Sequence, residues 1–284
     1  MVESVPVRSA GNAKLKTARA LRDGRDRDHV LLEGRHLLAE ALDAGVALQW
    51  VLHDPGLDSD AELAPLLRKA AAGGAEVQAC EPDLSRAGSD LDAPAGVLAC
   101  AARPQIEAAP LLADAAAGDW ALMLGGVQDP RNVGALVRVA AGLGARALLA
   151  AKGGGSPWHP RALRGASGNT FRLPVVERVD PAALLDAARA AGWQIWAADA
   201  GGAPPATLAA AARQAPVLLV LGEEGRGVAE DVLAHCDGRV GIPLARGVES
   251  LNVATAAAVL AWQLAGVGRD GTGAADAGAS ETPR

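Results

Sequence analysis

Three polar loops in the second half of the sequence each follow an apolar stretch and carry side chains suited to binding chemistry. They are "GGVQDPRNVGALVR" at 125–138, "LGEEGRG" at 221–227 and "IPLARGVESLN" at 242–252. Their most useful polar groups are those of Asn132, Glu224, Ser250 and Asn252. Taken singly, each group has a structural explanation, because amides and hydroxyls cap helices and a Gly-flanked acidic pair fits a tight turn. Taken together, the three loops indicate one polar site.

The elements around these loops determine whether the loops meet. The segments 119–125 and 216–221 are apolar on both faces, which is typical of buried parallel strands, and a helical pattern at 132–144 follows the first of them. We expect the third loop to leave a short strand at Ile242 and to enter a helix at 250–252. In an open parallel sheet, ligands bind beyond the carboxyl ends of the strands. The pattern therefore predicts an α/β domain with a binding site at one edge of its sheet.

The alternation of helix and strand also divides the chain into two domains. Residues 1–102 form a small α/β domain in this interpretation, with a connector at 103–117 that is partly helical. Residues 118–267 form the second domain, and 268–284 lack apolar periodicity and are expected to be a disordered tail. The first domain has expected helices at 12–24, 35–45 and 61–74, and expected strands at 29–34, 46–54, 75–81 and 95–102.

Several classes of protein are disfavoured by what the sequence lacks. No GxGxxG follows a strand, and there is neither a GxxxxGK[ST] motif nor an HExxH motif, so we expect no metal site and no nicotinamide dinucleotide fold. Cys80, Cys100 and Cys236 have no CxxC spacing and are expected to be buried thiols in a reducing cytoplasm. No apolar run approaches about 18 residues, and the first residues contain no signal-like apolar stretch, so we expect no membrane contact.

The charge of the chain is unevenly distributed. The net charge is -6, yet residues 8–27 contain seven Lys or Arg against two Asp, a local excess of +5. A basic segment on an acidic protein indicates either phosphate contact or an ordinary solvated helix face. With six Trp, one Phe and no Tyr, the chain has few rings on which to stack bases. We therefore expect any nucleic acid to be recognised through charge and shape.

Three segments carry a resemblance to a known family. "DPRNVGALVRVAAGLGA", "LVLGEEGRGV" and "IPLARGVESLNVATAAAVL" resemble the three ordered motifs of the SpoU (TrmH-like) RNA ribose 2'-O-methyltransferases of the SPOUT class. The likeness spans 118–267, and the first domain resembles the RNA substrate-binding domain of rRNA-directed members. It implies a homodimer whose parallel sheet contains a trefoil knot. It also implies S-adenosylmethionine as cofactor and structured RNA as substrate, and the added first domain favours 23S-type large-subunit rRNA as that substrate.

The resemblance also assigns roles to single residues. The catalytic set that it implies is Arg138, Asn132, Glu224, Ser250 and Asn252, the cofactor contacts are Gly222, Ile242 and Leu251, and the RNA contacts are Lys14, Lys16, Arg19, Arg22, Arg161 and Arg164. A guanidinium stays protonated in proteins, so we expect Arg138 to activate the hydroxyl electrostatically, with a reach toward the partner subunit's cofactor. The chain departs from the family pattern at Glu223, where the second motif commonly has Asn.

Other functions remain open at the level of sequence. The same motifs fit a tRNA methyltransferase, although tRNA-directed relatives generally lack the added first domain, and they fit an rRNA methyltransferase that confers antibiotic resistance. A non-catalytic RNA- or ribosome-binding protein of the same fold would be expected to lose part of the polar set, and Asn132, Arg138, Ser250 and Asn252 are all present.

Overall fold

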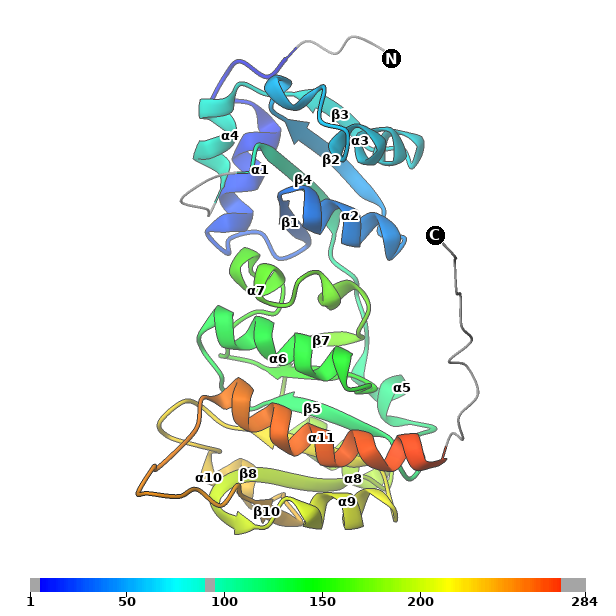
Figure 1. The fold of residues 1–284 in the computed structure, drawn as a ribbon, viewed down its shortest axis with the longest axis vertical. Helices are drawn as coiled ribbons and strands as arrows, with labels where there is room; N and C mark the ends of the chain where they lie inside the picture. The colour runs from blue at the N-terminus through cyan, green and yellow to red at the C-terminus, as the bar shows by residue number, and fades with distance from the viewer. Residues whose placement is uncertain (1–5, 90–94, 272–284) are drawn as a thin grey trace, which may run out of the picture.

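The computed structural model describes residues 6–89 and 95–271 and contains two sheets arranged along the long axis of the molecule (Figure 1). Residues 272–284, most of the predicted tail, lie outside the described part. The preceding helix, α11 (Val253–Gly271), includes the first four residues of the predicted tail, 268–271.

The first sheet has the order β1-β4-β2-β3 and consists of β1 (His29–Glu33), β4 (Val97–Ala102), β2 (Leu48–His53) and β3 (Glu76–Ala79). Strand β4 is antiparallel to both of its neighbours, and β2 and β3 are parallel. One face packs against α1 (Ala13–Arg22) and α4 (Pro82–Gly88), and the other against α2 (Arg35–Asp43) and α3 (Leu63–Ala72); η1 (Pro55–Leu57) follows β2. Alternate residues of β1 show the two faces, with Leu31 in the α1 cluster and Leu32 in the α2 cluster.

The second sheet is parallel throughout and has the order β10-β8-β9-β5-β6-β7. Its strands are β5 (Trp120–Leu124), β6 (Leu148–Ala151), β7 (Val175–Val179), β8 (Gln194–Ala203), β9 (Val217–Leu221) and β10 (Gly238–Val240). One face is covered by α6 (Pro130–Gly142), α7 (Pro160–Gly165), α9 (Ala206–Ala212) and α11, and the other by α5 (Ala108–Leu112), α8 (Pro181–Ala190) and α10 (Glu230–Leu233); η2 (Asn169–Phe171) follows α7. This arrangement confirms the predicted α/β class with a parallel sheet.

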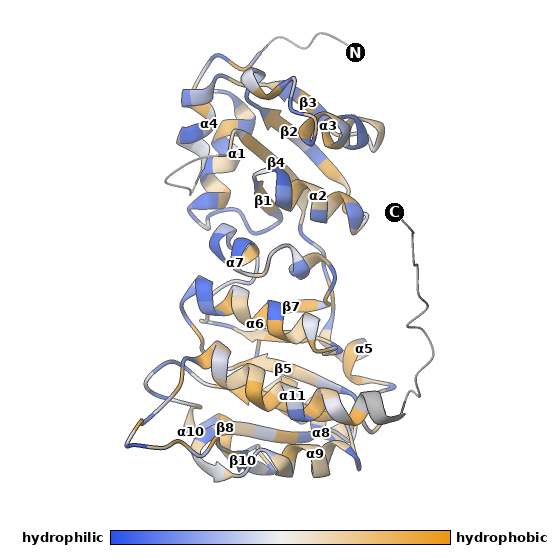
Figure 2. Cartoon of the chain, viewed as in Figure 1, coloured by the Kyte–Doolittle hydropathy of each residue, from blue (hydrophilic) through white to orange (hydrophobic). Residues whose placement is uncertain are grey.

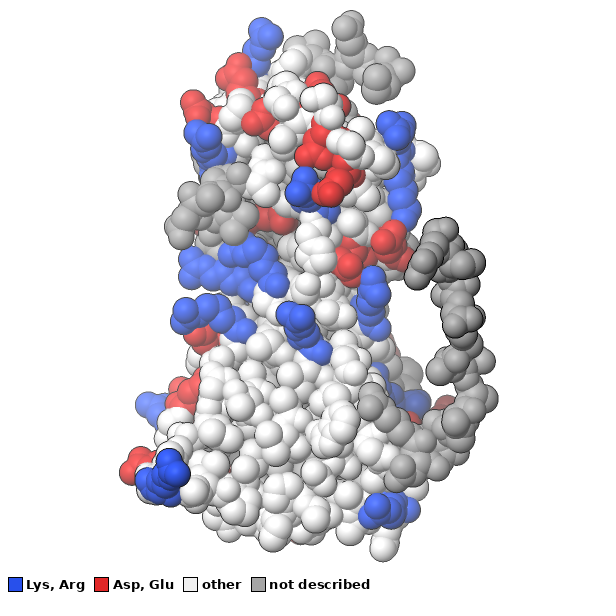
Figure 3. Space-filling model, in the orientation of Figure 1, with Lys and Arg blue, Asp and Glu red and all other residues white. Residues whose placement is uncertain are grey.

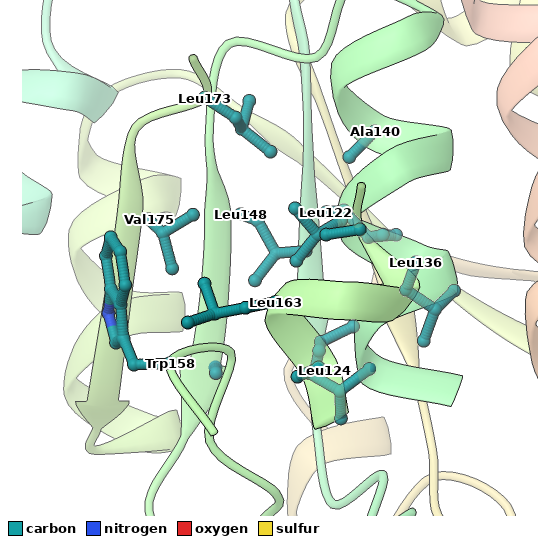
Figure 4. Close-up of a cluster of buried hydrophobic side chains, with 14 of the residues drawn as sticks. Leu122, Leu124, Leu136, Ala140, Leu148, Trp158, Leu163, Leu173 and Val175 are labelled. Carbon is teal, nitrogen blue, oxygen red and sulfur yellow. The ribbon is translucent and has the colours of Figure 1, made fainter. Parts of the chain in front are cut away.

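Apolar side chains fill the space between the second sheet and its covering helices. Leu122 and Leu148, on adjacent strands, point toward Leu136 of α6 and Leu163 of α7, and all four are buried (Figure 4). Colouring by hydropathy shows the same pattern along the strands and the inner sides of the helices (Figure 2). Helices α6 and α7 approach closely because Gly134 has no side chain: a Cβ there would lie 2.3 Å from the carbonyl oxygen of Ala162.

The structure corrects the predicted boundaries near the third loop. The strand expected at Ile242 is absent; β10 ends at Val240, and the chain is irregular from Gly241 to Asn252. Proline at 243 has no N–H to donate to a ladder, and the pairing of β10 with β8 already shifts register at Arg239 and Val240. Helix α11 begins at Val253, one residue after the predicted start. Sequence patterns also missed the short helices α4, α9 and α10.

The three cysteines are free thiols, as predicted. Cys80 and Cys100 are buried, whereas Cys236 is half-buried. Burial raises the pKa of the Cys100 thiol to about 12 and that of Cys236 to about 11. Among the residues that the structure describes, no helix is long and apolar enough to cross a membrane, and no group of His, Cys, Asp and Glu side chains is placed to hold a metal ion.

Candidate functional site

A chain of side-chain hydrogen bonds joins the three polar loops. The Nδ2 of Asn132 donates to Oε1 of Glu224 at 2.8 Å, and the Nδ2 of Asn252 donates to Oδ1 of Asn132 at 3.0 Å. The side-chain oxygen of Asn252 accepts from the N–H groups of Ala254 and Thr255, so Asn252 also caps α11. The structure therefore brings together three of the five side chains predicted as catalytic.

Asn132 is free for this contact because another residue caps its helix. Helix α6 begins at Pro130, and the carboxylate of Asp129 accepts from the N–H of Arg131 at 2.8 Å. The hydrogen bond from the Arg131 side chain, with that backbone bond, holds the pKa of Asp129 below its usual value. Asn132 lies within the first turn, so the interpretation of Asn132 as an N-cap is wrong.

A cavity of about 760 Å³ opens beside this hydrogen-bonded chain. The predicted cofactor contacts Gly222, Ile242 and Leu251 all line the cavity, together with Glu224, Ser250 and Asn252. Its size lies within the range of about 300–1,000 Å³ that is usual for small-molecule sites. Ser250 is exposed at the cavity and takes no part in the series of hydrogen bonds that joins the other polar residues.

The wall formed by the second loop is a tight turn that requires glycine. The N–H groups of Glu223 and Gly227 each donate to the carbonyl of the other at 2.9 Å. A Cβ on Gly222 would lie 2.0 Å from the carbonyl carbon of Gly227, so no larger residue fits that position. The Glu223 carboxylate lies 3.7 Å from the Arg226 guanidinium. The second polar loop is therefore the tight turn that the sequence predicts, and it also forms one wall of the cavity.

Arg138 stands apart from the other predicted catalytic residues. Its side chain is exposed on α6 and does not line the cavity. It makes no hydrogen bond or ion pair within residues 6–89 and 95–271. One chain alone therefore leaves this guanidinium away from the hydrogen-bonded polar residues.

The predicted RNA contacts differ in how available they are. Lys14 has only 14% of its side chain exposed and is held by Glu76 and by Gln78 at 2.9 Å, so it is part of the first domain's structure. Arg22 pairs with Asp23 at 2.9 Å, whereas Lys16 is exposed and Arg19 is half-buried.

Arg161 and Arg164 lie on α7, between the two sheets, where Lys and Arg side chains gather (Figure 3). Arg161 is exposed, and the Arg164 guanidinium lies 3.8 Å from the Glu33 carboxylate of the first domain.

Sequence reasoning missed Gln128. Its N–H lies 3.4 Å from the Glu224 carboxylate, and its side chain donates to the carbonyls of Gly126 and Gly153 at 3.1 and 2.9 Å. It therefore links the first and second polar loops to the Gly-rich loop after β6. Its place directly before Asp129 and Pro130, inside the first polar loop, was the available signal.

Comparisons with known proteins agree with this geometry. Residues 119–262 match the model of the SpoU rRNA Methylase family, and residues 12–99 match that of the MRM3-like substrate binding domain. The chain therefore belongs to the SpoU rRNA methylase family. The 23S rRNA (guanosine(2553)-2'-O)-methyltransferase RlmP of Bacillus subtilis (strain 168) is 30% identical over 266 residues, which cover 92% of this chain and 99% of that protein.

Solved structures that resemble most of the chain include two with AdoMet bound. The SpoU methyltransferase AviRb of Streptomyces viridochromogenes, in complex with the cofactor AdoMet, is 27% identical with a TM-score of 0.78 and covers 89% of this chain and 97% of its own. An AdoMet-bound rRNA methyltransferase of Sinorhizobium meliloti shares the fold, with 23% identity, a TM-score of 0.78 and coverage of 92% and 97%.

Proposed function

We propose that this protein transfers a methyl group from S-adenosylmethionine to a ribose 2'-OH of structured RNA, with 23S-type large-subunit rRNA as the substrate class. The observation that carries the proposal is the hydrogen-bonded chain from Asn252 through Asn132 to Glu224 at the mouth of the 760 Å³ cavity. Family membership and the rRNA named for RlmP support the choice of substrate. The three free thiols fit the reducing cytoplasm as the expected location.

The residues around the cavity suit the cofactor. Gly222 and the turn that follows it present main-chain groups, while Ile242, Leu251 and Leu260 supply apolar surface. Adenine binds well in such a slot, because main-chain groups pair with its edge and apolar side chains cover its faces. When bound, S-adenosylmethionine supplies an electrophilic methyl group. The AdoMet complex of AviRb, a relative of the same fold, supports this assignment.

The polar chain would position the groups around the reacting hydroxyl. Because both ends of the Asn132 amide are engaged, its orientation is fixed, and with it the relative placement of the first and third loops. Fixed placement of the ribose lowers the barrier by removing the need to orient the reactants in the transition state. Ser250, exposed at the cavity, would contact the nucleotide. Arg138 would stabilise the developing negative charge on the hydroxyl oxygen.

Arg138 would reach the reaction in a homodimer, at the cavity of the partner subunit. The large exposed apolar side chains of the described residues are Val248, Leu251, Val259 and Trp262, with 52%, 37%, 40% and 59% of their surfaces exposed. All four lie in the third loop or on α11, and the surface around α11 carries few charged side chains (Figure 3). Such a patch favours a protein interface. We also propose that the parallel sheet of the second domain contains the trefoil knot of the family. In the same way, we propose that the first domain ends at residue 102 and that the second begins at residue 118.

The deciding experiment measures methyl transfer directly. Tritiated S-adenosylmethionine is incubated with 23S rRNA from a bacterial strain in which the gene for this protein is deleted. The control is Arg213→Ala, which replaces an exposed arginine at the end of α9 that lines neither cavity described for this protein. We expect label in an alkali-resistant dinucleotide with the wild type and this control, and a loss of about a hundredfold with Arg138→Ala. Calorimetry with S-adenosylmethionine accompanies the assay. A wild type that binds no S-adenosylmethionine would contradict the proposal and favour a non-catalytic RNA-binding protein.

A further inference from the structure

A second cavity, of about 290 Å³, lies where the two domains meet. The first domain contributes Arg27 and His29 to its lining, and the second contributes the Gly-rich loop 153–156, His159 and Arg178. Arg103, at the start of the connecting segment, lies between them. The methyl-transfer site does not use this cavity, because none of these residues lines the larger one.

Arg178 occupies an unusual backbone conformation at this cavity. Its φ is +59°, in the left-handed region that non-glycine residues rarely adopt. The pairing of β6 with β7 skips it: Ala150 pairs with Glu177, and Ala151 pairs with Val179. A bulge of this kind redirects a side chain, so that Glu177 and Arg178 both face the cavity, whereas successive residues of a regular strand face opposite sides. Strain of this kind persists at sites where the surroundings or a function require it.

The cavity presents uncompensated positive charge. Glu177 forms an ion pair with Arg103 and accepts from the Ser156 hydroxyl at 2.7 Å. The carboxylate of Asp26, which also lines the cavity, accepts from the N–H of Asp28 and lies 3.1 Å from the His29 ring. Both lining carboxylates are therefore engaged. The exposed side chains of Arg27 and Arg178 have no hydrogen bond or ion pair to any residue in the described ranges 6–89 and 95–271.

The wall of this cavity is continuous with the methyl-transfer site. The N–H of Gly155 donates to the carbonyl of Val127 at 2.8 Å, and Gln128 donates to the carbonyl of Gly153 at 2.9 Å. A Cβ on Gly155 would lie 2.6 Å from the carbonyl oxygen of Gln128, so the two loops are in backbone contact. Because Gln128 also contacts Glu224, one residue connects the junction cavity to the hydrogen-bonded polar chain. The basic helix α1 ends at the opposite rim, where Leu21 and Gly24 line the cavity.

We propose that the junction cavity binds a phosphodiester group of the substrate RNA beside the target nucleotide, with Arg27 and Arg178 as the phosphate contacts. The choice of RNA as ligand rests on the proposed function. A volume of 290 Å³ has room for one phosphate and its sugar. Contacts to phosphates set the position of a strand without reading its sequence, which suits a chain with few aromatic rings. The bound strand would run from α1 across the cavity to the loop at 126–132.

The test uses the full-length protein and a fluorescein-labelled, single-stranded RNA of mixed sequence, about 20 nucleotides long. Arg178→Gly is the informative variant, because glycine adopts positive φ without strain and should leave the melting temperature unchanged or raised. We expect its Kd for RNA to rise about tenfold. The plot of the log of the association constant against the log of the salt concentration should become less steep by about 0.7, the value for one phosphate contact on a single strand. Arg27→Ala should act in the same direction, Arg178→Lys should restore part of the affinity, and Arg213→Ala should match the wild type.

Methyl transfer to 23S rRNA, measured beside the binding assay, separates this inference from the proposed function. Weaker RNA binding by Arg178→Gly with unchanged S-adenosylmethionine affinity supports the junction site, whether or not the wild type transfers a methyl group. Equal RNA affinity and salt slope for Arg178→Gly and the wild type would overturn the inference. If the two proteins bind RNA equally and the wild type still methylates rRNA, the proposed function stands and the junction site is ruled out.

Discussion

At the scale of single residues, the site depends on two amides that each use both ends of the side chain. Asn132 donates to Glu224 and accepts from Asn252, and the oxygen of Asn252 then accepts from the first turn of α11. Neither amide can turn over without losing a hydrogen bond on each side. Glu224 is the last residue in this series of hydrogen bonds, and its carboxylate only accepts. We therefore expect the loss of this carboxylate to loosen all three loops.

Glu224→Ala tests that dependence, and the neighbouring Glu223→Ala provides a matched control. Removing the Glu224 carboxylate leaves the Asn132 amide without its acceptor, so we expect kcat for methyl transfer to fall about a hundredfold because the first polar loop is misplaced. Glu223 pairs with the exposed Arg226, so Glu223→Ala should stay within about threefold of the wild type. Steady-state assays with tritiated S-adenosylmethionine measure both. Equal losses in the two variants would show that the second loop contributes charge and not a specific contact.

At the scale of elements, helix α6 carries Asn132 and must be held at a fixed depth against α7. The contact is made through backbone, because Gly134 lies against the carbonyl of Ala162 and no side chain fits between them. Leu136 and Leu163, both buried, pack in the same region (Figure 4). The position of the first polar loop therefore depends on the spacing of two helices.

Two glycines on α6 allow a comparison within one helix. A Cβ at Gly134 would overlap the Ala162 carbonyl, and we expect Gly134→Ala to lower the free energy of unfolding by about 3 kcal/mol, because backbone must move. At Gly142 no atom lies within 4 Å of the added Cβ, so Gly142→Ala should stabilise the helix by up to about 1 kcal/mol. Urea denaturation measures both. A small cost for Gly134→Ala would mean that α7 moves freely away from α6.

Elements also mark the limit of what the sequence predicts. The meeting of the three loops followed from the alternation of strands and helices, because the carboxyl ends of parallel strands share one edge. The end of β10 did not follow, because "IPL" is apolar enough for a strand and only Pro243 opposes it. The cap of α6 was misplaced by three residues because Asp129 and Asn132 are both good caps. Nothing local to Arg178 marks the bulge, which depends on the register of β6 against β7.

At the scale of the whole molecule, the two domains are joined by polar contacts. Arg103 pairs with Glu177 where the connecting segment starts, and both side chains are largely buried, with 10% and 16% exposed. Arg172 pairs with Glu40 at 2.7 Å on the outside of the same junction, with 53% and 22% exposed. His36 and Ser167 add a hydrogen bond of 2.8 Å. The junction cavity has a defined shape only while these contacts persist.

The two ion pairs predict different costs for similar substitutions. Arg103→Ala leaves the Glu177 carboxylate largely buried without its partner, so we expect a loss of about 3 kcal/mol in the free energy of unfolding. Arg172→Ala removes a more exposed pair and should cost less than about 1 kcal/mol. Calorimetry of both variants measures the difference and shows whether Arg103→Ala divides the thermal transition between the domains. Similar losses of unfolding free energy in the two variants would show that burial of the Arg103–Glu177 pair does not add to the stability of the protein.

The proposed homodimer makes the sharpest prediction, because in it Arg138 of one subunit would act at the cavity of the other. Arg138→Ala and Glu224→Ala are each expected to be nearly inactive as homodimers. When equal amounts are mixed, unfolded and refolded together, half of the dimers contain one subunit of each kind. In such a dimer, one cavity combines an intact Glu224 with the partner's intact arginine, while the other cavity lacks both groups.

We therefore expect the refolded mixture to recover about a quarter of the wild-type methyl transfer if the arginine acts across the interface. If Arg138 instead serves the cavity of its own chain, every cavity in the mixture lacks one group and no activity returns. The wild type refolded in the same way sets the reference for recovery. A tagged subunit, captured after mixing, shows that mixed dimers formed, so an inactive mixture that contains them would place the arginine in its own chain's site.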